Sequence, residues 1–154
     1  MKKSIRTKLE KMSGEKLIEI IDQLCDDKAT ERKLSLLVSP SSKDIDRAMS
    51  ELDSLSERYR NSPDSQYTFK KLCSAMEILL SVAENADSAT AAQIYYEMLE
   101  SFRTNDLLEI YDDTLNDYFF CAKDELTRLI KSKEEALPSE HLAEYKRAVD
   151  FDYE

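Results

Sequence analysis

The chain contains a single glycine in 154 residues, whereas roughly 7% is usual in proteins. Glycine provides the left-handed backbone conformations of tight hairpins, phosphate-binding loops and dinucleotide-binding turns, so its scarcity argues against folds built on them. Long hydrophobic runs are also missing. Stretches such as 119–122 are far shorter than the ~20 residues that span a bilayer. We therefore expect an all-α protein that has no membrane-spanning segment.

Residues that commonly carry catalysis or bind metals are few. His141 is the only histidine, so a site with several histidines is impossible. The three cysteines are far apart and each adjoins an apolar residue, which favours buried thiols in a reducing compartment over disulfides or zinc ligands: Cys25, Cys73 and Cys121. Charged side chains at 8–11 interrupt the place where a signal peptide would be apolar. We expect a cytoplasmic protein with no cofactor and no metal.

The net charge of −10 is unevenly distributed along the chain. It arises from 22 basic and 32 acidic side chains, and this excess of acid disfavours binding to nucleic acid phosphates. Residues 84–125 hold eleven acidic and two basic side chains, a net charge of −9, whereas residues 1–16 have a net charge of +4. The sequence thus predicts an acidic surface in its second half, suited to a basic protein partner.

Apolar residues recur at intervals of three and four along most of the chain, which predicts amphipathic helices. Serine or threonine precedes many of them and is expected to cap the helix: Ser13, Thr30, Ser42, Ser62 and Ser88. The expected helices are 14–26, 30–38, 43–60, 64–84, 89–103, 106–131, with a kink near Asn116 or Asp117 in the last of these, and a final helix after Pro138.

These segments predict one all-α domain, 1–154, arranged as an antiparallel helical array or short α-solenoid of seven to eight helices. Residues 1–12 would form an N-terminal arm and 138–154 a final helix and tail, in which Phe151 and Tyr153 either dock or remain exposed for a partner. No fixed period is found, so a regular tetratricopeptide array is not supported. Apolar residues in the outermost helices would either cap the array or pair two copies.

One pattern resembles an enzyme site. Glu97 and Glu100 precede a predicted turn and Glu109 and Asp112 follow it, so two carboxylate pairs on facing helices could hold Mg²⁺, as in all-α nucleotide pyrophosphohydrolases. That family has a longer segment between its pairs, and no lysine or arginine follows at a fixed spacing to bind phosphate. We therefore expect these carboxylates to lie on the solvated sides of two helices.

A second pattern favours a binding surface. Glu109, Asp113 and Asp117 are spaced four residues apart, which on one continuous helix would align three like charges at a cost in stability. Such a stripe, with the neighbouring Asp112, is a candidate contact for a basic partner. Two aromatic residues lie off the main apolar stripes and are candidates for exposure in the same surface: Tyr96 and Phe120.

The N-terminal pattern Leu9-x-x-Met12-Ser13-x-x-x-Leu17-Ile18-x-x-Ile21, residues 34–38 and a long helix from Asp44 resemble the helical region that accompanies SWIM zinc fingers in bacterial proteins of unknown function. The stretch from Ala75 through Ile110-Tyr111-Asp112-Asp113 to Cys121-Ala122 is similar to the helical repeats that follow in those proteins. The resemblance covers residues 9–131 and implies a helical-repeat scaffold. It implies no zinc site, because the CxC and CxH ligand pairs of a SWIM finger are absent.

The sequence thus favours a non-enzymatic, cytoplasmic scaffold or interaction protein that presents an acidic surface to a protein partner. One alternative is an immunity or inhibitor protein for a basic toxin or nuclease, because complementary charge accelerates association. A third is the Mg²⁺-dependent nucleotide pyrophosphohydrolase.

Overall fold

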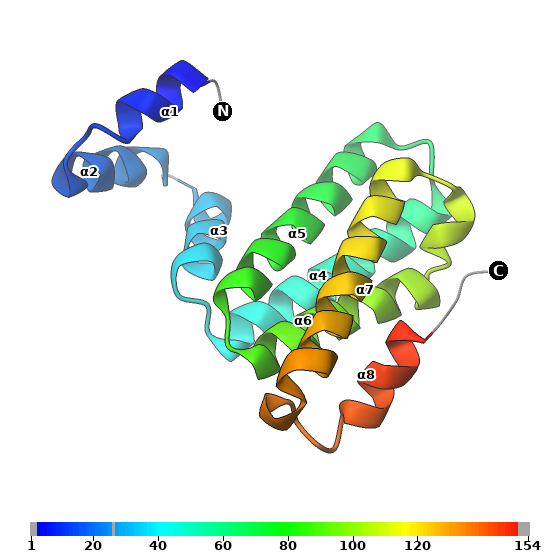
Figure 1. Cartoon of the computed structure of the whole chain (residues 1–154). Coiled ribbons are helices and arrows are strands. Elements are labelled where there is room, and N and C mark those ends of the chain that lie inside the picture. Colours follow the sequence, from blue (N-terminus) through cyan, green and yellow to red (C-terminus); the bar gives the residue numbers. More distant parts are fainter. Residues whose placement is uncertain (1–2, 26, 151–154) are drawn as a thin grey trace. The chain divides into compact units, whose positions relative to one another are not determined.

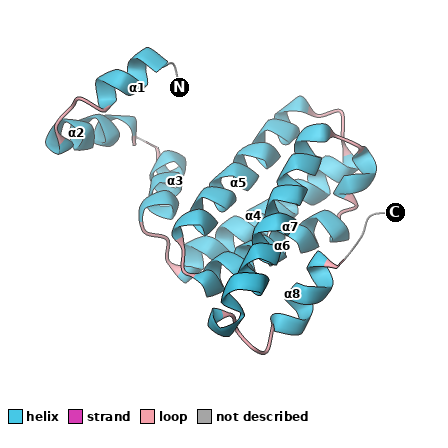
Figure 2. Ribbon diagram, in the orientation of Figure 1, coloured by secondary structure: helices cyan, strands magenta, loops and turns pink. Residues whose placement is uncertain are grey.

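The computed structural model describes residues 3–25 and 27–150. Within them the chain forms eight α-helices, two short 3-10 helices and no strand (Figures 1 and 2). The α-helices are α1 (Lys3–Leu9), α2 (Gly14–Leu24), α3 (Lys28–Val38), α4 (Ser42–Asn61), α5 (Gln66–Asn85), α6 (Ser88–Thr104), α7 (Asp113–Lys133) and α8 (Leu142–Val149), and the 3-10 helices are η1 (Leu107–Ile110) and η2 (Glu134–Ala136). The predicted all-α class is confirmed. Phe151 and Tyr153, expected either to dock or to remain exposed, lie outside the described residues.

The chain divides into two compact units, 1–39 and 40–154, which we call unit 1 and unit 2. Unit 1 therefore extends well beyond the arm of residues 1–12 that the sequence suggested. In unit 2, each helix from α4 to α7 packs against the next one along the chain, and α7 packs against α8. Short connections join the longer helices, so neighbours run antiparallel (Figure 1).

The core of unit 2 forms around α6, which packs against α4, α5, α7, α8 and η1. Eight of its seventeen residues are buried, including Ile94, Met98 and Phe102, which are inaccessible to solvent. Surrounded in this way, α6 keeps only a narrow edge for its charged residues. Burial of one large apolar side chain contributes ~1.5–3 kcal/mol to the free energy of unfolding. The buried apolar faces of α4–α8 are therefore the main source of stability in this unit.

A buried polar contact fixes α4 against α6. The Ser101 hydroxyl donates to the Ser56 hydroxyl at 3.0 Å, and the latter donates to the Leu52 carbonyl at 2.9 Å. The Asn105 amide donates to the Asp53 carboxylate at 3.0 Å. Because two small serines meet at this crossing, the two helices pack closely and Asp53 stays at the edge of their interface.

The capping residues of α3, α4, α5 and α6 lie one to three residues from the expected ones. Ser13 caps α2 as predicted, whereas Asp27 rather than Thr30 caps α3 and Asp87 rather than Ser88 caps α6, each by accepting backbone N–H bonds. Ser41 caps α4 and forms a reciprocal capping box with Asp44. Ser65, not Ser62, caps α5. Where the cap differs from the expected residue, a nearby side-chain oxygen is placed to accept the free N–H groups of the first turn.

The helix expected over 106–131, with a kink near Asn116 or Asp117, is interrupted at an earlier position. The chain forms η1, then turns at Tyr111 and begins α7 at Asp113, and no break occurs at Asn116 or Asp117. Asp106 and Tyr111, at the two ends of η1, have left-handed backbone with φ of 50° and 56°. Asp112 caps α7 by accepting the Leu115 N–H at 3.1 Å. This capping residue marks the start of α7 and separates it from η1.

The buried position predicted for the cysteines is also wrong. Cys25 and Cys73 are half-buried and Cys121 is exposed. On α7 the buried positions include Phe119, Ala122 and Leu126, so Cys121 falls outside the face that meets the core.

Replacement of Tyr111 by glycine is expected to raise the free energy of unfolding by about 1 kcal/mol, because a left-handed conformation costs a side-chain-bearing residue ~1–2 kcal/mol. The Tyr111 side chain is 80% exposed, so little packing is lost. Urea denaturation measures the effect. Tyr67, 70% exposed in the first turn of α5, is the control for the same change of residue: Tyr67→Gly should lower stability, because glycine loses more backbone freedom in a helix and the contact of the ring with Lys71 is removed. A loss of stability in Tyr111→Gly would contradict this account.

Candidate functional site

Two neighbouring grooves lie along the remaining exposed edge of α6. We name the first the aromatic groove: it has a volume of about 430 Å³ and lies between α6, η1, α7 and α8. We name the second the acidic groove: it has a volume of about 450 Å³ and lies between α4 and α6. Glu100 lines both grooves, so they adjoin at this residue. Both belong to unit 2.

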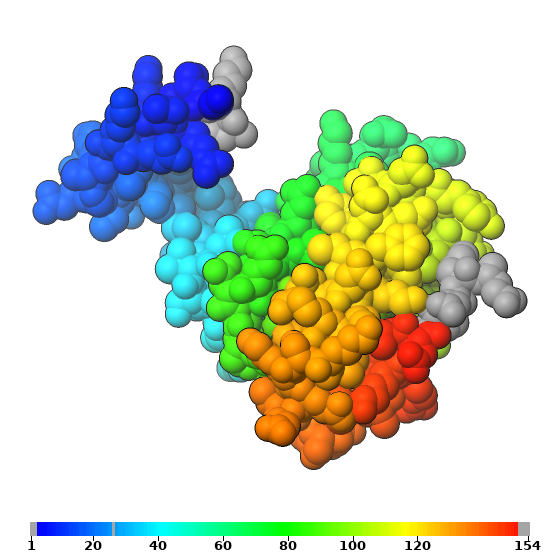
Figure 3. Space-filling model, viewed as in Figure 1, coloured from blue at the N-terminus to red at the C-terminus, as the bar shows by residue number. Residues whose placement is uncertain are grey.

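The aromatic groove has an apolar floor. Leu99, Phe102, Leu108 and Phe119 line it and are buried. The rings of Phe102 and Phe119 meet edge to face, with centroids 5.6 Å apart. On the side of α8, which lies next to α7 in Figure 3, the Tyr145 ring packs on that of Tyr96 at 5.2 Å. Helix α8 is therefore held by ring contacts, and the groove lies beside them.

The rim of the aromatic groove is charged and mostly acidic. Its lining includes two arginines and four carboxylates: Arg103, Arg147, Glu100, Asp106, Glu109 and Glu144. Arg103 forms an ion pair with Glu100 on the same helix. Arg60 of α4 reaches Glu109 at 3.1 Å and Asp106 at 3.9 Å, which ties η1 to α4. The rim thus retains a net negative charge around an apolar floor.

The acidic groove concentrates charge of one sign. Asp46 and Asp53 of α4 face Glu97 and Glu100 of α6 across it, and none of the described residues that line it is basic. Burial raises the pKa of Glu97, and the neighbouring carboxylates of Glu100, Asp46 and Asp53 raise it further. A positive charge near Glu97 would therefore favour its ionised form.

The residues that the sequence predicted for a partner surface separate into three places. Tyr96 and Glu109 line the aromatic groove. Asp112 is the cap of α7, and Asp113 follows it at the helix start, where an acidic side chain complements the helix dipole. Asp117 lies one turn further along α7 and is exposed.

Phe120 is 52% exposed, as predicted, and contacts Phe119 on the solvent side of α7. The expected exposure of Tyr96 is wrong, because the ring packs on α8 and is half-buried. The predicted stripe of three like charges is also wrong: Glu109 belongs to η1, and the turn at Tyr111 separates it from Asp113 and Asp117.

Sequence reasoning missed the contribution of α4 and α8. Asp46 and Asp53 are seven residues apart, which places them on one face of a helix, and this spacing was available in the sequence. What the sequence does not give is which helix they face. The structure pairs them with Glu97 and Glu100, whereas the sequence suggested Glu109 and Asp112 as the facing pair.

In residues 3–25 and 27–150, no group of three or more histidine, cysteine, aspartate or glutamate side chains is arranged to hold a metal ion. The facing pairs required for the Mg²⁺ hypothesis are therefore not formed by the four residues proposed for it. Also within these ranges, no helix has the length and apolar character needed to cross a membrane.

Replacement of Glu97 by glutamine is expected to raise the free energy of unfolding at pH 7 by on the order of 0.5 kcal/mol, because each nearby like charge costs a few tenths. The raised pKa means that folded Glu97 holds its proton more tightly than the unfolded chain does. The wild-type protein therefore loses stability as the pH rises from the unfolded pKa of ~4.3 through the folded pKa.

The benefit of Glu97→Gln should consequently shrink as the pH falls and vanish below about pH 4. Urea denaturation of the two proteins between pH 4 and pH 7 tests this. Glu57→Gln is the control, since Glu57 is an exposed residue of α4 outside both grooves and the chemical change is identical. A benefit that is independent of pH would exclude the electrostatic explanation.

Comparisons of the chain with protein-family models, with curated proteins and with solved structures found no match. The resemblance to the helical region of SWIM-associated proteins stays a prediction.

Proposed function

We propose that this protein is a non-enzymatic, cytoplasmic interaction protein, and that unit 2 binds a basic, amphipathic segment of a protein partner. One observation carries the proposal: a groove with an apolar floor opens beside a groove lined by four carboxylates, and Glu100 belongs to both. The odd number of cysteines, which cannot all pair with one another in disulfides, supports the cytoplasmic location.

The aromatic groove suits an apolar side chain of the partner. Its floor of Leu99, Phe102, Leu108 and Phe119 is already buried and closely packed, so an incoming leucine or aromatic side chain would lie against an apolar surface without moving the core. Two arginines on the rim are engaged within unit 2 itself: Arg103 pairs with Glu100, and the Arg147 guanidinium donates to the Ala143 carbonyl at 3.4 Å.

The acidic groove suits a lysine or arginine of the same partner segment. On a helix, a basic residue three or four positions from an apolar one lies on the same side, which matches two grooves that meet at Glu100. Burial and then the neighbouring carboxylates raise the pKa of Glu97, and a cation there would oppose both effects. Residues 40–154 contain 13 basic and 25 acidic side chains, a net charge of −12, which would attract a basic partner over longer range.

Selection from a displayed library of random helical peptides, with the full chain as bait, tests the proposal. The expected winners carry lysine or arginine three or four positions from leucine or an aromatic residue, and their affinity falls as salt is added. Enrichment of acidic peptides, or of apolar peptides without basic residues, would contradict a basic partner. An absence of any enriched peptide would contradict a peptide-binding surface in this unit.

Charge reversal locates the binding surface. Glu97→Lys combined with Glu100→Lys should weaken the selected peptide at least ~10-fold, since close charge pairs at interfaces contribute on the order of 1 kcal/mol or more each. Asp113→Lys combined with Asp117→Lys gives the same change in net charge outside both grooves and should alter affinity by less than ~3-fold. Fluorescence anisotropy measures both. The reverse order of effects would place the surface at the start of α7 instead.

A further inference from the structure

Helices α1 and α2 of unit 1 expose most of their large apolar side chains. Ile18 and Leu24 of α2 are 60% and 65% exposed. Around the helix axis, the apolar residues of α2 occupy one continuous side, and its polar residues occupy the other. Ile5 on α1 and Met12 just beyond it are also exposed. Unit 1 therefore displays a largely uncovered apolar face over two adjacent helices.

Unit 1 does not bury this face in a core of its own. Among its described residues only Leu36 is buried, and that residue belongs to α3. Helices of seven and eleven residues are marginal in water without packing. Contact with another surface would therefore stabilise α1 and α2.

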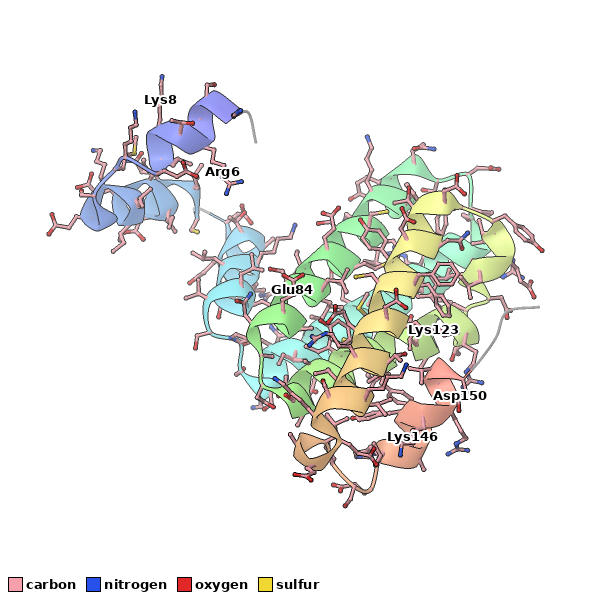
Figure 4. The ribbon with its side chains drawn as sticks, viewed as in Figure 1. Arg6, Lys8, Glu84, Lys123, Lys146 and Asp150 are labelled. Carbon is pink, nitrogen blue, oxygen red and sulfur yellow. The ribbon has the colours of Figure 1, made fainter. Side chains whose placement is uncertain are left out.

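The net charges of the two helices have opposite signs. α1 carries Lys3, Arg6 and Lys8 and no acidic residue, and Arg6 and Lys8 project from opposite sides of it (Figure 4). The polar side of α2 carries three acidic side chains and one lysine: Glu15, Glu19, Asp22 and Lys16. Arg6 pairs with Glu10 just beyond α1 at 3.0 Å, and Lys16 pairs with Glu19 within α2 at 2.8 Å. The remaining charges are basic on α1, from Lys3 and Lys8, and acidic on α2, from Glu15 and Asp22, so the two helices have net charges of opposite sign.

We propose that two copies of this chain associate through unit 1, with α1 of each copy packed on α2 of the other. In a two-fold dimer each contact occurs twice, so one pairing buries the apolar side of both helices and places basic α1 beside acidic α2 in both halves. An anionic membrane fits less well, because interfacial helices carry lysine and arginine on the polar side and α2 carries mostly acid there. This inference concerns unit 1 and does not depend on the grooves of unit 2.

Sedimentation equilibrium of the full chain tests the association. The wild-type protein should be a dimer at micromolar concentration. Ile18→Glu combined with Leu24→Glu should raise the dissociation constant at least ~100-fold, because both substitutions act twice in a two-fold interface. Gln23→Glu places a negative charge on the polar side of α2 and should leave the dissociation constant within ~3-fold. Circular dichroism checks that unit 2 stays folded.

Charge exchange tests the pairing of α1 with α2. In a first variant α1 is made acidic by Arg6→Glu and Lys8→Glu, and in a second α2 is made basic by Glu15→Lys and Asp22→Lys. Each variant alone brings like charges together and should be mainly monomeric, whereas a mixture of the two should form heterodimers, since both contacts are then between opposite charges.

Several outcomes would overturn the proposal. A wild-type chain that remains monomeric up to about 100 µM excludes a dimer of useful affinity. A dimer that Ile18→Glu with Leu24→Glu leaves unaltered lies elsewhere on the molecule. Failure of the two charge variants to pair when mixed excludes the contact between α1 and α2. Binding of the monomer to anionic lipid vesicles, lost in the Ile18→Glu and Leu24→Glu variant, would assign the face to a membrane.

Discussion

The arrangement of unit 2 depends on the burial of α6. Five elements pack around this helix, so its apolar residues can point in almost every direction and its charged residues cannot. Glu97 and Glu100 must leave the core along the one edge that remains, and α4 brings Asp46 and Asp53 to the same edge. The concentration of negative charge is therefore a consequence of packing, because the carboxylates of a central helix can reach solvent only along its one exposed edge. The Ser56 and Ser101 contact fixes how near the two helices come.

The two units differ in net charge and in how much apolar surface they bury. Residues 1–39 have a net charge of +2 and residues 40–154 have a net charge of −12. Unit 2 has a core of its own and open grooves on its surface, whereas unit 1 has exposed apolar helices and almost no core. Under the two proposals, unit 2 would receive a segment of a partner and the apolar helices of unit 1 would be covered. The proposed partner and the proposed second copy would thus occupy separate parts of one molecule.

Periodicity and composition were sufficient to predict the helical class and the positions of most helices, because each amphipathic stripe is a local property. The prediction failed between α6 and α7, where the apolar spacing of a helix and a helix-capping residue occur in the same stretch of sequence. Helical spacing continues across Tyr111, from Leu108 to Leu115 and Phe119. Asp112 is nevertheless a good cap, and its capping of α7, together with the packing of η1, ends the regular helix before Asp113. The grooves could be predicted only in part. The spacing of Asp46 and Asp53 marks a helix face, but its meeting with Glu97 depends on the packing of α4 on α6, which no local pattern specifies.

The turn at Tyr111 has a further consequence for how the chain tolerates changes in length. Within a continuous helix, an inserted residue rotates everything beyond it by about 100° and turns the apolar stripe away from the core. The left-handed residues at both ends of η1 interrupt that transmission between α6 and α7. Tyr111 is exposed, so an extra residue beside it can be accommodated in the turn while Leu115 and Phe119 keep their places in the core. This junction separates the rotational register of α7 from that of α6, and natural variation in length can accumulate there without loss of the fold.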